Sequence, residues 1–143
     1  MKKNELHIYL GRMFRSHWRV TTNRFAKIGL SSAQPKLLHY LSTHAGAMQR
    51  EIAESCNIEP ATATSILSGM EQTELIYREA DTKDRRIIRT FLTDKGKQTL
   101  QEIERIFFEV EDICYQDFSE SEIEQLYTFL ERMYQNMQKV ENE

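Results

Sequence analysis

Apolar residues near the start of the chain recur at intervals of three, four and seven positions, the spacing of one face of an α-helix. Within residues 5–28 this stripe consists of Leu6, Leu10, Met13, Phe14, Trp18, Phe25 and Ile28, with His17 on the same face. Because most of the arginines fall outside the stripe, the pattern predicts one long amphipathic helix. The aromatic-rich faces that hold Phe14, Trp18, Phe25 and, further along, Tyr40 are expected to be core.

A second helix is predicted to begin near Ser31 and to run to about His44. Ser31 and Gln34 have the spacing of a capping box, in which the Ser31 hydroxyl accepts from the Gln34 amide while the Gln34 side chain reaches back. Pro35 then falls in the first turn, where a missing N–H matters least.

Two further helices follow, and the second of them has a hydroxylated face. Residues 48–55 predict a short helix with Ile52 and Ala53 facing inward, and Pro60 opens the next helix at its first position. That helix carries Ile66, Leu67 and Met70 on one side and Thr62, Thr64, Ser65 and Ser68 largely on the other.

The central part of the chain predicts a β-hairpin with a positively charged tip. Residues 75–80 and 86–92 are short and rich in β-branched or aromatic side chains, and the charged segment 81–85 separates them. Thr93 after the second strand is a natural N-cap for another helix.

The last part of the chain predicts two helices with heptad seams, the second opened by a capping box over residues 119–122. Such seams on a small chain favour a homodimer. The seam residues expected at the dimer contact are Leu6, Leu10, Leu100, Ile103, Phe107, Val110, Ile123, Leu126, Leu130, Met133 and Met137, with Cys114 and Val140 continuing the two repeats.

Charge is distributed unevenly along the 143 residues. Residues 1–27 hold seven cations and one anion, whereas residues 98–143 hold three cations and twelve anions. Residues 78–97 are again cationic, with seven against four. Because salt screens distant charges, a polyanion meets these local fields rather than the net charge of −3. The last third is expected to repel DNA.

Composition and motifs exclude several classes of protein. The chain is 40% hydrophobic and has no apolar run of the ~18 residues that a membrane span needs, so a cytoplasmic location is expected. Cys56 and Cys114 have no ligand spacing and are expected to be free thiols, and the four histidines show no metal-binding pattern. No catalytic set or phosphate-binding glycine loop appears, so we expect no enzyme, no cofactor and no metal.

Three helices followed by a two-stranded hairpin is the order of a winged helix-turn-helix. The fold class expected is therefore mainly α with a small β-hairpin wing (α+β), in one domain. The first two turns of the helix from Pro60 carry small, hydroxylated side chains that fit a major groove about 12 Å wide. A positive hairpin tip suits the flanking backbone or the minor groove, whose negative potential attracts arginine.

The chain also resembles a known family. Its hairpin reads Asp81, Lys83, Asp84, Arg85, Arg86, then Leu92, Thr93 and Gly96, which looks like the wing signature of the MarR family of winged-helix regulators. The supporting frame is similar too: Gln49, Glu51, Ile52 and Ala53, then Thr62 and Thr64, Met70 and Glu71, and finally Leu75, Ile76 and Arg78.

The resemblance implies a homodimer that binds a pseudo-palindromic operator in double-stranded DNA. Residues 1–28 and 97–143 would form dimerisation helices around a DNA-binding lobe at 30–96. Arg86 matches the wing-tip arginine that enters the minor groove, Asp84 matches the acid that orients it, and neighbouring cations would bind phosphates. The residues expected at DNA are Gln49, Thr62, Thr64, Ser65, Ser68, Lys83, Asp84, Arg85 and Arg86.

The family's effector pocket lies between the dimer helices and the DNA-binding lobe, and here it would be lined by Phe14, Arg15, His17, Trp18 and Tyr40. The chain departs from the family at Glu74, where glycine is usual, and at Ser65, where arginine is common. A homodimeric repressor released by a small molecule is the function expected. The alternatives are a redox- or metal-responsive regulator on the same scaffold, and a protein-interaction dimer that does not bind DNA.

Overall fold

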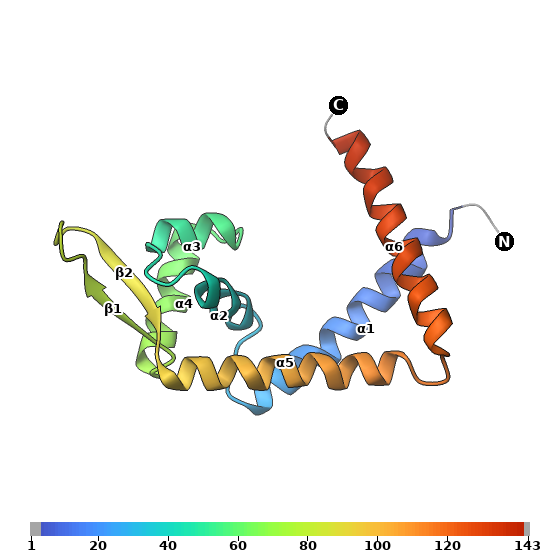
Figure 1. Cartoon of the computed structure of the whole chain (residues 1–143), viewed down its shortest axis with the longest axis horizontal. Coiled ribbons are helices and arrows are strands. Elements are labelled where there is room, and N and C mark those ends of the chain that lie inside the picture. Colours follow the sequence, from blue (N-terminus) through green and yellow to red (C-terminus); the bar gives the residue numbers. More distant parts are fainter. Residues whose placement is uncertain (1–3, 142–143) are drawn as a thin grey trace. The chain divides into compact units, whose positions relative to one another are not determined.

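A computed structural model describes residues 4–141 of the chain, and Figure 1 traces its elements. The described residues form six α-helices and one antiparallel two-stranded sheet, which confirms the predicted fold class. In chain order they are α1 (Leu6–Lys27), α2 (Gln34–Thr43), α3 (Gln49–Ser55), α4 (Pro60–Gln72), β1 (Ile76–Ala80), β2 (Ile88–Leu92), α5 (Asp94–Cys114) and α6 (Glu120–Glu141).

The chain divides into two compact units between Phe108 and Glu109. In the first unit, α2, α3 and α4 pack together beside the hairpin (Figure 1). Their inward positions form an aliphatic core in which Leu37, Leu38, Leu41, Ile52, Ala63, Leu67, Met70 and Ile76 are buried. The predicted inward positions Ile52, Ala53, Leu67 and Met70 are confirmed, whereas Ile66 is only half-buried.

The ends of the helices in the first unit confirm three of the four local signals predicted there. Pro35 lies in the first turn of α2 and Pro60 begins α4. The Thr93 hydroxyl accepts from the Gly96 N–H at 2.9 Å, so Thr93 caps α5 as predicted. The Ser31 box is wrong in one half: the Gln34 side chain does accept from the Ser31 N–H at 3.2 Å, but α2 begins only at Gln34 and no side chain caps it.

The second unit contains the end of α5 and all of α6. The predicted box before α6 is present, because Ser119 Oγ accepts from the Glu122 N–H at 3.3 Å while Glu122 Oε2 accepts from the Ser119 N–H at 2.8 Å. The bond from the Ser119 N–H, and then a further one that the Ser119 hydroxyl donates to Glu122 Oε2 at 2.9 Å, lower the pKa of Glu122. No residue of α6 is buried in the single chain.

Exposure corrects two predictions about apolar residues. Phe25 is buried and lies 5.5 Å from Phe107, edge to face, but Phe14 and Trp18 are 66% and 47% exposed and are not core in the single chain. Ile103 and Val110 are each only 2% exposed, so they add almost nothing to a dimer contact, and Ile106 was missed as a buried member of the same helix. The other seam residues remain at least partly exposed: Leu6, Leu10, Leu100, Phe107, Ile123, Leu126, Leu130, Met133 and Met137.

None of the helices described in residues 4–141 combines the length and apolar character that crossing a bilayer requires.

Candidate nucleic-acid interface

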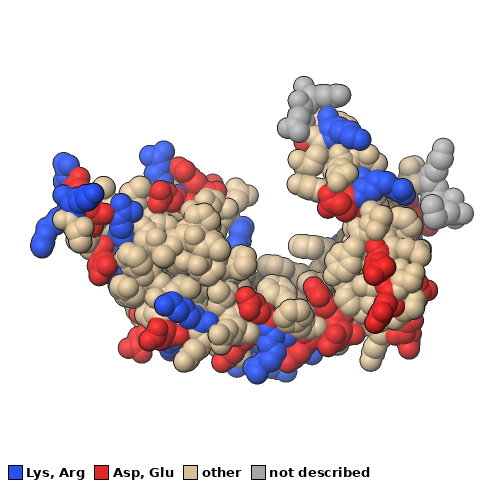
Figure 2. All heavy atoms as spheres, in the orientation of Figure 1, with Lys and Arg blue, Asp and Glu red and all other residues tan. Residues whose placement is uncertain are grey.

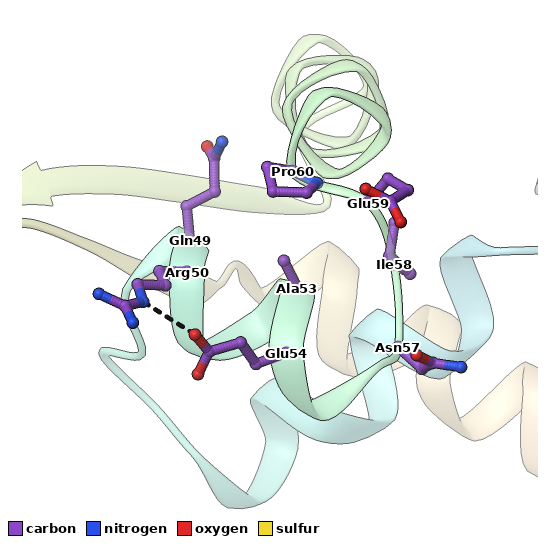
Figure 3. A pocket seen from close by; sticks show the side chains of 8 residues that line it. All are labelled: Gln49, Arg50, Ala53, Glu54, Asn57, Ile58, Glu59 and Pro60. Atoms are coloured by element: carbon purple, nitrogen blue, oxygen red, sulfur yellow. Dashed lines mark hydrogen bonds and ion pairs between the residues drawn. The ribbon is translucent and has the colours of Figure 1, made fainter.

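Helices α3 and α4 form a helix-turn-helix with a groove of about 800 Å³ between them (Figure 3). The turn passes through Asn57, whose φ of +52° is in the left-handed region that asparagine tolerates better than most residues. Along the groove, Arg50 Nε donates to Glu54 at 2.8 Å, so an anion lies directly beside this cation. Since Glu59 also lines the groove, this surface is not strongly positive.

The predicted recognition face of α4 lies on the surface. Thr62, Thr64 and Ser65 are exposed and Ser68 is half-exposed, while the opposite side of the helix packs into the core through Ala63, Leu67 and Met70. The face offers only methyl and hydroxyl groups, so it has no side chain able to make the bidentate contact that reads guanine most strongly.

Gln49 and Thr64 are joined by a hydrogen bond between α3 and α4. Gln49 Nε2 donates to Thr64 Oγ1 at 2.6 Å, and Thr64 Oγ1 donates to the Pro60 carbonyl at 3.0 Å. Gln49 Oε1 in turn accepts from Arg78 Nη1 at 3.5 Å. Gln49, which we expected to face DNA, therefore has both polar ends engaged within the protein.

The tip of the hairpin gathers exposed cations, and Figure 2 shows Lys and Arg side chains clustered there. Arg86 Nε and Nη2 donate to the two carboxylate oxygens of Asp84 at 3.0 and 2.9 Å, and the Arg86 N–H donates to the same group at 3.1 Å. These bonds lower the pKa of Asp84. The Arg86 side chain is nevertheless 90% exposed, so it is oriented without being covered. Lys83 and Arg85 are exposed beside it.

Asp81 organises the start of the wing loop, a role that the sequence did not reveal. Its Oδ1 accepts from the N–H groups of Lys83 and Asp84 at 2.8 and 3.1 Å, and its Oδ2 accepts from Arg89 Nε at 2.5 Å. The Arg89 bond, then the two backbone bonds, lower the pKa of Asp81 to about 2. Arg89 also donates to the Gly46 carbonyl at 3.0 Å, so this cation ties the wing to the loop after α2.

The corner between α4 and β1 is one of the two points where the chain departs from the family that it resembles. Glu74 occupies it with a φ of +61°. The Thr93 hydroxyl donates to the Glu74 carbonyl at 2.5 Å, and Lys95 Nζ donates to the Thr73 carbonyl at 2.7 Å. A Cβ at Gly96 would lie 2.1 Å from the Leu75 carbonyl oxygen, so only glycine permits this approach. The corner therefore joins α4, β1 and α5.

An apolar pocket of about 360 Å³ lies between α1, α2 and α5 within the first unit. Its wall includes Trp18, Phe25, Pro35, Leu100, Ile103 and Phe107, with Ser32, Lys36, His39 and Glu104 among the lining residues. Of the five residues expected in an effector pocket, only Trp18 lines it. Phe14, Arg15, His17 and Tyr40 do not: Tyr40 stacks on His44 with ring centroids 4.2 Å apart, and Arg15 lines a separate shallow surface of α1.

The two cysteines differ in exposure. Cys56 is 2% exposed, and burial raises the pKa of its thiol, which leaves little thiolate to react. Cys114 is half-exposed near the end of α5. Within residues 4–141, no three His, Cys, Asp or Glu side chains gather where they could hold a metal ion.

Comparison with known proteins finds the same architecture in transcriptional regulators. Residues 30–88 match the model of the MarR family. The chain is 31% identical over 97 residues to the uncharacterized HTH-type transcriptional regulator YxaD of Bacillus subtilis, and the match covers 68% of each protein. It is 38% identical over 77 residues to the HTH-type transcriptional repressor MdtR of the same organism, a match that covers 54% of this chain and only half of MdtR.

Among solved structures, a point mutant of S. aureus MepR superposes with a TM-score of 0.82 at 28% identity, covering 92% of this chain and 98% of that one. A different point mutant of MepR, bound to an oligodeoxyribonucleotide, gives a TM-score of 0.70 at 28% identity, with 92% and 97% covered.

Proposed function

This chain belongs to the MarR family of transcriptional regulators, and from that premise we propose that it is a homodimeric, sequence-specific DNA-binding repressor released by a small molecule. Its curated relatives are transcriptional regulators rather than enzymes. The single observation that carries the proposal is the wing tip, where Asp84 holds an arginine that is 90% exposed.

A solvated guanidinium normally loses rotamer freedom when it enters a groove. Because Arg86 already makes two side-chain hydrogen bonds to Asp84, part of that freedom is lost before DNA arrives. A narrow minor groove concentrates negative potential and attracts such a group. Lys83 and Arg85 lie exposed on the same loop, where they suit phosphates, which position a protein without reading sequence. A MepR mutant that superposes on this chain has been solved with an oligodeoxyribonucleotide.

Exposed apolar side chains and complementary charge support the homodimer. Leu6, Leu10, Leu130 and Met137 are between 43% and 62% exposed in the single chain. Monomeric soluble proteins rarely expose this much apolar surface along their helices. Residues 1–27 are strongly cationic and residues 98–143 strongly anionic. A second copy would supply the opposite charge to each of these segments as well as cover the apolar surface.

The pocket between α1, α2 and α5 supports release by a small molecule. Its volume of about 360 Å³ is within the range of small-ligand sites, and its wall is mostly apolar. Pro35, Lys36 and His39 place α2 along the pocket, and the loop after α2 reaches Gly46, whose carbonyl holds Arg89 of the wing. A ligand that shifts α2 would therefore act on the wing. An allosteric coupling of this kind is typically about 1–3 kcal/mol.

The test compares three variants in an electrophoretic shift titration at fixed low salt, with the promoter upstream of the protein's own gene as probe. Arg86→Ala is expected to weaken binding by about tenfold or more, because it removes the groove contact. Thr64→Ala is expected to weaken it less. Arg105→Ala is the matched control, since it removes one exposed cation from α5 and should change affinity less than about twofold.

A larger loss from Thr64→Ala than from Arg86→Ala would contradict the wing's leading role. If the wild type fails to bind at low salt, where electrostatic affinity is greatest, the DNA-binding function itself is wrong and a protein-interaction dimer takes its place. A redox-responsive regulator is not favoured at Cys56, because that thiol is buried and its pKa is raised.

A further inference from the structure

The hydroxyl group of Thr64 has its only hydrogen committed inside the protein. It donates to the Pro60 carbonyl at 3.0 Å and accepts from Gln49 Nε2 at 2.6 Å. A threonine hydroxyl has one donor and two acceptor positions, so what remains for a ligand is one acceptor position and the methyl group. Since Thr64 is exposed on the recognition face of α4, these are the groups it presents to DNA.

The orientation of the Gln49 amide is fixed by groups on two other elements. Arg78 on β1 donates through Nε and Nη2 to Glu71 Oε2 at 2.9 and 2.5 Å, and its side chain is only 24% exposed. Its Nη1 points to Gln49 Oε1 at 3.5 Å. A guanidinium has donors only, so the amide oxygen must face Arg78 and the amide nitrogen must face Thr64.

We propose that Glu71, Arg78 and Gln49 form a relay that fixes Thr64 as a hydrogen-bond acceptor toward the major groove. The inference rests on the proposed DNA-binding function and adds to it the class of base that Thr64 selects. In the major groove adenine and cytosine present amino donors and thymine presents a methyl group, whereas guanine presents only the acceptors N7 and O6. Thr64 therefore favours adenine, cytosine or thymine at the base it faces and disfavours guanine.

Ser65, the next residue of α4, provides the internal comparison. It is exposed on the same face, and its hydroxyl makes no hydrogen bond to the part of the chain that the structure describes. A serine hydroxyl that can rotate offers either a donor or an acceptor, so Ser65 tolerates more kinds of base edge than Thr64. The relay, and not the hydroxyl alone, is what makes Thr64 selective.

The relay is tested by selecting duplexes that the wild type and its variants bind from a randomised library, and by sequencing the bound duplexes. Each duplex has about 20 randomised base pairs, which is long enough to span two half-sites one helical turn apart. Thr64→Val keeps the shape and the methyl group but removes the hydroxyl, so the positions whose base preference it changes are those that Thr64 faces. Gln49→Met is uncharged, has a similar shape and cannot donate. It should lower the preference against guanine at those same positions by about five- to tenfold, with a smaller effect on affinity for the best duplex.

Three measurements separate the relay from a merely structural role. The double variant Gln49→Met/Thr64→Val should match Thr64→Val at those positions, because Gln49 acts only through Thr64. Ser65→Ala should change other positions and leave these alone. Arg78→Lys keeps the charge but loses the guanidinium fork that bridges Glu71 and Gln49, so it should cause the same loss of preference against guanine as Gln49→Met. It therefore replaces Gln49→Met in the test if the Gln49 variant does not fold.

The outcomes distinguish the inference from the function beneath it. If the wild type enriches no motif, the proposed DNA-binding function has failed. If it enriches a motif but Gln49→Met and Arg78→Lys leave the preference at the Thr64 positions within twofold, the relay is wrong. Guanine enriched by the wild type at those positions would overturn it equally.

Discussion

Replacing Glu74 with glycine should stabilise the protein, although the change removes a side chain. Glu74 is at the corner between α4 and β1 with a φ of +61°, a conformation that glycine adopts freely and other L-residues do not. Its side chain is exposed, and the contact that matters at this position is the Thr93 hydroxyl donating to the backbone carbonyl, which glycine keeps.

The expected gain follows from two opposing terms. Holding a residue with a Cβ in the left-handed region costs about 1–2 kcal/mol. Glycine reduces the gain from relieving this strain by about 0.4–1 kcal/mol, because it has more conformational freedom in the unfolded chain and loses more of it on folding. The net gain in the free energy of unfolding is about 0.5–1 kcal/mol. At about 2–4 °C per kcal/mol for a chain of this size, Tm should rise by about 1–4 °C.

Thermal unfolding followed by circular dichroism at matched protein concentration measures this shift, with Glu74→Ala as the control. Alanine removes the same charge and side chain but keeps the Cβ, so its Tm should stay within about 1 °C of the wild type. If alanine stabilises as much as glycine, the gain comes from removing the carboxylate and the backbone argument fails. If glycine lowers Tm, the left-handed conformation is not a source of strain here.

Three other changes test the packing around the wing. Gly96→Ala should lower the free energy of unfolding by about 3 kcal/mol in a denaturant titration, because its Cβ would meet the Leu75 carbonyl oxygen; an effect below about 1 kcal/mol would contradict that close approach. Thr90→Val should raise the free energy of unfolding by about 1 kcal/mol in the same assay, because the buried Thr90 hydroxyl has no partner in the described chain; a loss would mean that the hydroxyl is satisfied. The wing loop should lose order as pH falls from about 4 towards 2, because the pKa of Asp81 is lowered on folding and its carboxylate stabilises the folded state only while ionised. Hydrogen exchange of the Lys83 amide measures this loss of order, and Asp81→Asn should remove its dependence on pH. If exchange in that variant still rises with acid, a group other than Asp81 causes the response.

The parts of the fold that the sequence predicted well are those controlled by short-range chemistry. Pro60, Thr93 and Ser119 mark helix starts because each acts on atoms within four residues. The wing pair is equally local, since Asp84 and Arg86 are two positions apart and their hydrogen bonds close within the loop. At Glu74, where the chain departs from the usual glycine, the residue itself adopts the left-handed conformation, with a φ of +61°.

The pocket could not be predicted in the same way, because its wall comes from three elements distant in sequence. Trp18 on α1, His39 on α2 and Phe107 on α5 meet there, whereas Arg15 and His17 were grouped with Trp18 only by closeness in the chain. Helical spacing shows that one face of α1 is apolar, but it does not show which part of that face meets α2. The same spacing could not separate Ile103, buried within one chain, from the exposed Phe107.

Gln49 is the site residue whose contacts could least be predicted from the sequence motif. By its place before the recognition helix, a glutamine with a free amide would be a candidate to read adenine. Its partners Thr64 and Arg78 are 15 and 29 positions away, and together they occupy both ends of the amide. In the proposed relay, Gln49 acts on DNA through the Thr64 hydroxyl that it orients. For a recognition helix made of small hydroxylated residues, the proposal makes selectivity depend on which hydroxyls the rest of the fold orients. The Thr64 hydroxyl is oriented by the Pro60 carbonyl and by Gln49, and the Gln49 amide is oriented in turn by Arg78 of β1.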